Sequence, residues 1–427
     1  MVQTNEANSG QSRWYVLILL SIIYTIYNID RNLVVILAEP IKTEFLLSDT
    51  QLGLLTGTSF AIAFALAGIP LGFLVDRANR VRLLAVLLAI WSAATALCSL
   101  VRTFPLLIAA RIAVAGAESG AAPTSLSIIG DSFPKSKRGT AIGIFYLGTP
   151  IGMAAGFAIG GYVAQFIGWR EVFLLAGLPG ILFALIVFLT MREPERGAFD
   201  KDEKGAELVS SLGNVFKVLK QKTSLVFLLL AAIAIIIGQS GIGQLMASHY
   251  VRHYDLPLAQ AGYSIAFIMG VGGAVGMPAG GIVSDWVSKR SLAFAPRCAG
   301  FIAALSIPFA IVGCLAPTLE ISILAFFIYS IIVHSYLGPT FSTFLSLSPA
   351  RLRGAMSALL LVGMNLVGFG IGPQLTGIIS DVFNARGIEE PLRYAMLLMT
   401  FFLLLSAIFY FIASTTTNKD AESDEAE

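Results

Sequence analysis

Twelve long apolar runs follow one another along this 427-residue chain and leave it few possible folds. In a helix, about 20 apolar residues span the roughly 30 Å hydrocarbon core of a bilayer. Because 56% of the residues are apolar and only 13% are charged, the chain lacks the polar surface that soluble domains of this length need. We therefore predict an all-α membrane protein with twelve transmembrane helices. The predicted spans are 14–38, 51–75, 82–102, 105–130, 139–166, 171–191, 223–249, 259–284, 291–315, 318–346, 354–380 and 391–413.

The lysine and arginine residues predict how the chain crosses the membrane. If successive loops alternate sides, 20 of these 28 residues fall on one side and 6 on the other, and the other two lie within predicted spans. Basic residues accumulate on the cytoplasmic side of membrane proteins. We therefore predict a multi-pass protein of the plasma (inner) membrane with both termini in the cytoplasm.

The longest polar stretch, 192–222, separates two sets of six predicted helices. We predict a cytoplasmic N-terminal segment at 1–13, six-helix domains at 14–191 and 223–413, and a cytoplasmic interdomain linker at 192–222. The remaining residues, 414–427, end in DAESDEAE. We expect this tail to be disordered because it is acidic and poor in apolar residues.

Two short patterns recur in the second half of the chain. The pattern G-x3-D-x3-[RK] at 72–80 recurs at 281–289, which is 209 residues further on. The pattern P-x3-R-G at 134–139 recurs at 349–354, which is 215 residues further on. Short cytoplasmic turns often contain Gly, Asp and Arg, and this would explain one match. Two matches in the same order indicate that the two halves repeat one architecture.

Over residues 14–413 the chain resembles the major facilitator superfamily, and 72–82 is similar to the signature loop between helices 2 and 3 of that family. Asn79 stands where a second glycine is usual. The resemblance implies two pseudo-symmetric six-helix domains that alternate between inward-open and outward-open states. It also implies gating roles for residues of this loop and of its repeat, namely Asp76, Arg77, Arg80 and Asp285.

Four charged residues lie deep within predicted spans, away from the span ends: Asp30 and Arg31 in the first, and Arg111 and Glu118 in the fourth. Inserting one charged side chain near the bilayer centre costs roughly 2.5–3.5 kcal/mol. Residues of this kind usually mark a substrate or ion pathway or a proton relay. At about 1.5 Å per residue, Glu118 lies close to the midplane. The four charges could neutralise one another, so a static ion-pair network that locks the two helices is the alternative interpretation.

Helical spacing predicts which side of the first span faces the substrate. Tyr24, Tyr27, Asn28 and Arg31 are spaced i, i+3, i+4 and i+7, so they share one face. Asp30 points about 100° away from Arg31. A guanidinium on the shared face could hold a carboxylate or phosphate in a two-pronged grip. We therefore predict that this face binds substrate.

The string Tyr27–Asn32, together with Arg111 and the sequence 116–119, resembles the spinster branch of the superfamily, whose animal members export sphingolipids and lysolipids. Glycines are usual in that branch at two positions that are alanine here, 115 and 117. The resemblance implies that Asp30, Arg31 and Glu118 form the coupling and substrate-handling cluster, with Glu118 and Asp30 carrying protons. It implies that Arg111 supports this cluster.

The spans of the second half contain neutral polar and aromatic residues rather than charges. His334 is the one residue there that could titrate near neutral pH, although a hydrogen-bonded core histidine is the simpler interpretation. Phe341, Phe344 and Phe369 could form an apolar wall for a substrate tail. We predict that these four residues contact the substrate. The i, i+4 spacing of two further histidines, 249 and 253, is too weak a signal to predict a metal site.

These features favour a secondary active transporter that moves an amphiphilic anion, such as a lysolipid or a sphingolipid-like molecule, by proton-coupled alternating access. A small organic acid or a drug-like metabolite is the alternative substrate. A lipid-modifying enzyme is disfavoured because the intramembrane residues include no nucleophile–base pair. A channel is disfavoured because an open pore has no use for a gating loop that is repeated in both halves. The sequence contains no P-loop pattern, which argues against transport driven by ATP. We expect no cofactor, no metal and no nucleic-acid partner, and a monomer in the bilayer.

Overall fold

The computed structural model describes residues 11–197, 212–288, 291–349 and 352–422. All regular structure in these ranges is helical, and twelve helices there are long and apolar enough to cross a membrane. The predicted all-α fold with twelve spans is confirmed. The spans are Arg13–Ile36, Asp49–Arg77, Arg80–Cys98, Phe104–Ser132, Lys135–Phe166, Trp169–Thr190, Thr223–His253, Leu258–Trp286, Phe294–Leu315, Leu319–Ser346, Arg353–Ala385 and Pro391–Ala421.

Contacts divide the described chain into two compact units. The first combines the residues up to Leu37 with those from Ile62 to 197, and the second combines Ala38–Ala61 with the residues from 212 onward. The sequence instead predicted a division near 192–222. Segment 38–61 belongs to the second unit because its helices pack against α13 and α20.

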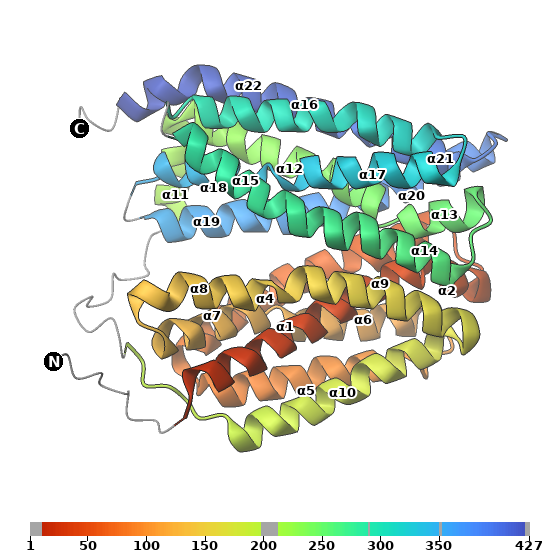
Figure 1. Cartoon of the computed structure of the whole chain (residues 1–427), viewed down its shortest axis with the longest axis horizontal. Helices are drawn as coiled ribbons and strands as arrows, with labels where there is room; N and C mark the ends of the chain where they lie inside the picture. Colours follow the sequence, from red (N-terminus) through yellow and green to blue (C-terminus); the bar gives the residue numbers. More distant parts are fainter. Residues whose placement is uncertain (1–10, 198–211, 289–290, 350–351, 423–427) are drawn as a thin grey trace. The chain divides into compact units, whose positions relative to one another are not determined.

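The first unit contains α1 (Arg13–Ile36), α5 (Arg80–Cys98), α6 (Phe104–Glu118), α7 (Ala121–Ser132), α8 (Lys135–Tyr146), α9 (Gly148–Phe166) and α10 (Trp169–Thr190), together with most of α4 (Ser59–Arg77) (Figure 1). Segment 38–61 contains α2 (Ala38–Phe45), α3 (Asp49–Gly53) and the π-helix η1 (Leu54–Thr58). The rest of the second unit contains α11 (Leu212–Gln221), α12 (Thr223–Gly243), α13 (Met246–His253), α14 (Leu258–Ile265), η2 (Ala266–Val271), α15 (Gly272–Ser288), α16 (Phe294–Leu315), α17 (Leu319–His334), α18 (Leu337–Ser346), α19 (Arg353–Val362), η4 (Gly363–Phe369), α20 (Gly370–Ala385), α21 (Pro391–Leu398) and α22 (Thr400–Glu422).

Many spans are interrupted near their middle, and the interruptions recur in the two halves. The fourth span breaks after Glu118, where α6 ends, and the tenth breaks after His334, where α17 ends. Both helices begin after a threonine N-cap, Thr103 and Thr318, and these positions are 215 residues apart. Backbone groups freed by such breaks must be buried in protein or line a polar cavity. Glu118 and His334, which are 216 residues apart, each end the first segment of the interrupted span in their half.

The predicted disordered tail needs a correction. Helix α22 continues through 414 to Glu422, and residues 423–427 lie outside the described part. Asp420 is only 8% exposed, and its Oδ2 accepts hydrogen bonds from Ser224 N at 2.7 Å and Ser224 Oγ at 2.5 Å. This carboxylate lies at the N-terminus of α12, where the helix dipole attracts negative charge. An acidic residue of the segment that we predicted to be disordered thus caps the N-terminus of α12.

Glycines of α9 allow it to approach α1 closely. A Cβ atom placed on Gly152 would lie 2.6 Å from the carbonyl oxygen of Thr25 and 2.5 Å from Cβ of Asn28. A Cβ on Gly156 would lie 3.1 Å from the carbonyl oxygen of Ile29. Small residues that bring helix backbones together are typical of membrane interfaces. This contact fixes the side of α1 that carries Asn28.

We predict that Gly152→Ala destabilises the protein by about 1–3 kcal/mol, because the added methyl group overlaps backbone atoms of α1. Thermal unfolding of the purified protein in detergent measures the effect. Gly143→Ala is the matched control, since a Cβ at Gly143 meets no atom within 4 Å. Equal melting temperatures for the two variants would contradict the close contact.

Candidate functional site

Three of the four charges predicted inside the membrane are fully buried in the first unit. Asp30 of α1, Arg111 of α6 and Glu118 at the end of α6 are 1%, 2% and 1% exposed. Asp30 Oδ2 accepts a hydrogen bond from Thr95 Oγ1 of α5 at 3.1 Å. Arg111 interacts electrostatically with both carboxyl groups. The structure therefore places these three charged residues in one buried group within the first unit.

Glu118 occupies an unusual position within this group. Among the described residues, neither of its carboxyl oxygens has a hydrogen-bond partner. Asp30, Arg111 and Arg31 all contribute to its electrostatic environment. A buried carboxyl group held only by charges across space is costly when ionised, unless a positive group stays close. Such a group is suited to gaining and losing a proton.

Arg31 points in a different direction from Asp30. It is half-buried, and its Nη1 donates a hydrogen bond to the hydroxyl of Tyr27 at 3.0 Å. Tyr27 stacks on Tyr24 with ring centroids 5.3 Å apart. The fourth member of the predicted face, Asn28, is 5% exposed and its side chain donates to the carbonyl of Tyr24 at 2.8 Å. Asn28 lies against α9, so Tyr24 and Arg31 are the more accessible members.

Sequence reasoning missed residues that complete this face. Tyr24 also stacks on Phe145 at 4.3 Å and meets Tyr146 edge-on at 5.5 Å. Both partners end α8, just before the break at Leu147 in the fifth span. A proline at position 150, which can kink a helix, is the sequence signal for this interruption.

The predicted gating residues divide into one buried residue and three exposed ones. Arg80 is 1% exposed, and its guanidinium donates to Asp131, to Glu193 Oε1 at 2.6 Å and to Ser127 Oγ at 3.0 Å. We call Arg80, Asp131 and Glu193 the Arg80 network. No sequence pattern indicated the two acidic partners, which lie 51 and 113 residues further along the chain.

The side chains of Asp76, Arg77 and Asp285 are exposed within their own units. The backbone carbonyl of Asp76 accepts a hydrogen bond from Arg196 Nη1 at 2.6 Å. Asn79, the residue that departs from the family pattern, is the N-cap of α5, and its side chain accepts from Arg82 N at 2.8 Å. Asparagine is a favoured N-cap, so this departure suits the turn.

In the second unit, the predicted residues of the substrate wall are not equally accessible. Phe344 of α18 is fully buried in the interior, whereas Phe341 and Phe369 are half-buried. His334 is 8% exposed at the end of α17. Its Nδ1 lies 2.7 Å from the carbonyl oxygen of Ser330, and its Nε2 lies 2.9 Å from Nε2 of Gln239 on α12.

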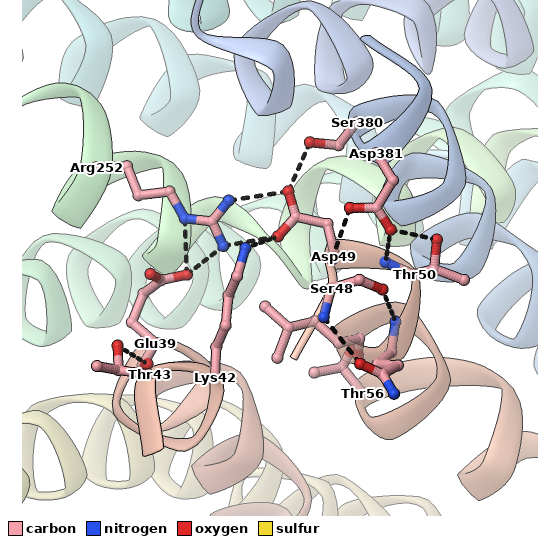
Figure 2. Close-up of polar contacts among 12 residues, drawn as sticks. Glu39, Lys42, Thr43, Ser48, Asp49, Thr50, Thr56, Arg252, Ser380 and Asp381 are labelled. Atoms are coloured by element: carbon pink, nitrogen blue, oxygen red, sulfur yellow. Dashed lines mark hydrogen bonds and ion pairs between the residues drawn. The ribbon is translucent and has the colours of Figure 1, made fainter. Parts of the chain in front are cut away.

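A second charged group, which the sequence assigned to loops, fastens segment 38–61 within the second unit (Figure 2). Arg252 of α13 donates to Glu39 Oε1 at 2.5 and 2.9 Å and to the two carboxylate oxygens of Asp49 at 2.8 and 2.9 Å. Lys42 Nζ is 2.5 Å from Asp49 Oδ1. We call Glu39, Lys42, Asp49 and Arg252 the Arg252 network.

Helix α20 holds the same segment through the N-terminus of α3. Asp381 of α20 accepts hydrogen bonds from the backbone N of Asp49 at 2.9 Å and of Thr50 at 2.8 Å (Figure 2). Ser380 Oγ donates to Asp49 Oδ2 at 2.6 Å. Ser48 and Gln51 form a capping box at this helix end. The start of α3 is therefore capped both by its own residues and by α20.

A smaller ionic group within the second unit joins the end of α13 to the start of α21. Glu390 contacts His253, and its Oε2 accepts from Arg393 Nη1 at 2.5 Å. Burial alone would raise the pKa of Glu390, but the hydrogen bond from Arg393 and the attraction of His253 hold this pKa below its ordinary value. The contact is therefore present near neutral pH and weakens as the pH falls through the pKa of Glu390.

We predict that Arg252→Gln lowers the stability of the protein by about 1–3 kcal/mol. Removing the cation leaves Glu39 and Asp49 with excess negative charge, and the 27% exposure of the arginine side chain reduces the cost below that of a fully buried pair. Arg386→Gln, at an exposed end of α20, is the control. Melting curves that coincide for both variants would show that the Arg252 network does not fasten segment 38–61.

The chain is similar to a known family of membrane transporters. Residues 20–369 match the profile of the family described as Major Facilitator Superfamily. A solved bacterial homolog of the human lysosomal transporter spinster, in an inward-facing and unoccupied conformation, is 30% identical with a TM-score of 0.87, and the match covers 96% of this chain and 99% of that one.

Two curated relatives differ in the substrates that their names give. The sphingosine-1-phosphate transporter SPNS2 of Danio rerio is 30% identical over 52% of this chain and 45% of its own length. The probable galactarate/D-glucarate transporter GudP of Bacillus subtilis is 27% identical over 69% of this chain and 70% of its own length. One name specifies a lipid phosphate and the other specifies sugar diacids.

Proposed function

Because this chain belongs to the major facilitator superfamily and, within it, to the spinster branch, we propose that it is a proton-coupled transporter of an anionic amphiphile. Membership makes it a multi-pass integral membrane protein and a secondary transporter rather than an enzyme. The observation that carries the coupling proposal is Glu118, a buried carboxyl group that has no hydrogen-bond partner among the described residues.

Coupling follows from competition for arginine. When Glu118 is ionised, it attracts Arg111 and Arg31. When Glu118 takes up a proton, this attraction disappears and Arg31 is released to bind an anion. When the substrate leaves and Glu118 loses its proton, the carboxylate attracts Arg31 and Arg111 again. Asp30, hydrogen-bonded to Thr95, is the second carboxyl group that can share the proton. Proton and substrate are thereby linked through one set of cations.

Arg31 is the proposed anchor for the anionic group of the substrate. Its guanidinium can hold a phosphate or a carboxylate with two parallel hydrogen bonds. Tyr27, which accepts a hydrogen bond from Arg31, is buried, and the half-buried Tyr24 that stacks on it is the proposed apolar contact beside the anchor. In the second unit, the half-buried Phe341 and Phe369 are the proposed contacts for an apolar tail. The name of the zebrafish relative supports an amphiphile, and that of the Bacillus relative makes a small organic acid the alternative.

The two ionic networks have proposed roles in alternating access. Segment 38–61 continues directly into α4, most of which belongs to the first unit, and we assign to the Arg252 network the role of holding this segment within the second unit during transport. We assign the Arg80 network, with the exposed Asp76, Arg77 and Asp285, to the cytoplasmic gate. The proposed transporter acts as a monomer in the plasma (inner) membrane.

We predict that Glu118→Gln abolishes accumulation of substrate driven by a proton gradient, because the amide cannot exchange a proton with the cluster. Uptake into proteoliposomes with an imposed pH gradient measures this. Glu171→Gln, an exposed position in the first turn of α10, is expected to transport normally. If the Glu118→Gln variant still concentrates substrate, Glu118 has no part in the coupling mechanism.

We predict that Arg31→Lys loses most of the binding of the anion, because an ammonium group cannot reproduce the two-pronged contact. Affinity is expected to rise with acyl-chain length by up to about 0.8 kcal/mol for each buried methylene. Ligand-induced thermal stabilisation across a chain-length series tests both statements, with Arg13→Lys, exposed on the same helix, as the control. Strong competition by sugar diacids together with indifference to chain length would favour the organic-acid alternative.

The proposed orientation predicts opposite labelling of two positions. Single cysteines at Gly197 and Glu389, in a background without Cys98, Cys298 and Cys314, should react from the cytoplasm and from outside, respectively. A membrane-impermeant maleimide applied to intact cells should therefore label only the cysteine at 389. Labelling of both positions from outside would mean that the predicted cytoplasmic placement of 197 is wrong.

A further inference from the structure

The repeat gives the second unit a neutral counterpart of the Asp30–Glu118 pair. The offset of 209 residues that relates Asp76 to Asp285 also relates Asp30 to Gln239. Glu118 and His334 are the last residues of α6 and α17, whose threonine N-caps are 215 positions apart. Helices that carry acids in one half therefore carry an amide and an imidazole in the other.

Gln239 and His334 contact each other directly. Gln239 Nε2 and His334 Nε2 are 2.9 Å apart, and they join α12 to α17 across 95 positions of sequence. His334 is 8% exposed and Gln239 is half-buried. The imidazole is therefore enclosed, while the amide retains an accessible side.

The hydrogen bonds fix the tautomer of the imidazole. A carbonyl oxygen only accepts, so the 2.7 Å contact of His334 Nδ1 with the carbonyl of Ser330 requires the hydrogen to be on Nδ1. In the neutral ring, Nε2 is then an acceptor. It accepts from the NH2 group of Gln239, which leaves the amide oxygen Oε1 for other partners. This geometry is consistent at every step with a neutral histidine.

Addition of a proton reverses this arrangement. Protonated His334 donates from both ring nitrogens, so its Nε2 can no longer accept from Gln239. A half-turn of the amide restores the contact by presenting Oε1 to the ring. The NH2 group of Gln239 then becomes the accessible side. One proton on a buried ring thus changes the exposed group of Gln239 from an acceptor to a donor.

The charged side chains on the described elements around His334 lie at helix ends, away from this switch. Helices α12 and η2 contain no charged residue. On the helices that pack against α17, Asp285 is in the last turn of α15 and Arg297 is in the first turn of α16. Glu320 lies in the first turn of α17 itself, at the opposite end from His334.

Asp285, the charged residue on α15, is separated from the imidazole ring of His334. A Cβ on Gly276 of α15 would lie 3.1 Å from Cβ of His334, and Asp285 lies nine residues beyond Gly276. This separation is roughly 13 Å along the helix. The remaining titratable side chains on α16 and α17 are Cys298, Cys314 and Tyr329.

We propose that Gln239 and His334 form a second substrate contact, which accepts a hydrogen bond from a substrate hydroxyl or ammonium group and becomes a donor to an anionic oxygen when His334 is protonated. This inference rests on the proposed function and refines its substrate class. The proposed substrate then carries a hydroxyl or ammonium group in addition to its phosphate or carboxylate. A sugar acid lacks the tail but offers hydroxyl groups, so the contact by itself is compatible with both candidate substrates.

The first experiment needs no substrate. The chain has three histidines, so nitrogen-15 spectra of histidine-labelled protein in nanodiscs contain few ring signals, and those absent from His334→Gln belong to His334. At high pH we expect a protonated Nδ1 and an unprotonated Nε2. Gln239→Met should shift the Nε2 signal, whereas Gln260→Met, at an exposed position of α14, should not. A hydrogen on Nε2 of the neutral ring would overturn the proposed switch.

The second experiment tests the substrate contact with a matched pair of ligands, a lysophosphatidic acid and its analogue without the glycerol hydroxyl. At a pH where His334 is neutral, we expect the wild type to bind the hydroxyl compound about fivefold more tightly, as one hydrogen bond allows. Gln239→Met should bind both equally, and Gln260→Met should discriminate as the wild type does. Equal binding of both ligands by the wild type would overturn the contact while leaving the proposed function intact. Failure of both ligands to bind would count against the amphiphile, and the nitrogen-15 spectra would still test the switch.

Discussion

The cost of placing ionised groups in a medium of low dielectric constant shapes the first unit. Asp30, Arg111 and Glu118 are almost completely buried, and each depends on the others for compensation. Apolar residues would pack in the same place at lower cost. The buried acids and the arginine beside them are the groups on which the proposed coupling depends.

Helix interruptions position the polar side chains in both halves. Glu118 and His334 each end the first segment of an interrupted span, where the backbone no longer continues in a regular helix. Phe145 and Tyr146 lie at the corresponding kind of break in the fifth span. Such breaks are tolerated only where protein or a polar cavity covers the freed backbone groups. A helix interruption thus positions the acidic Glu118 in the first half and the hydrogen-bonding His334 in the second half.

Segment 38–61 shows how chain connectivity and packing can differ. By sequence it joins the first span to the second, yet its contacts are with α13 and α20. Asp381 caps α3 from another helix, and Arg252 neutralises Glu39 and Asp49. Because α3 also has its own Ser48–Gln51 capping box, the capping of its N-terminus does not depend on Asp381 alone.

The sequence by itself determined the twelve spans, the repeat and the positions of the intramembrane charges, because these follow from composition and spacing along the chain. It also indicated that Asp30, Arg31, Arg111 and Glu118 could neutralise one another, because their depths place them in adjoining layers of the membrane. It did not predict that α22 continues to Glu422, because the cap that Asp420 provides to α12 depends on a residue 196 positions away.

Only the tertiary structure decided which face of each helix meets protein. Helices in lipid are apolar both where they contact one another and where they contact acyl chains, so hydrophobic periodicity does not distinguish the two sides. Asn28 therefore lies against Gly152 although spacing placed it with Arg31, and Phe344 is buried although it was grouped with Phe341. The acidic partners of Arg80 and of Arg252 and the amide partner of His334 lie 51 to 213 positions away from them in the sequence. Pairs at such distances form through helix packing, which local sequence patterns do not specify.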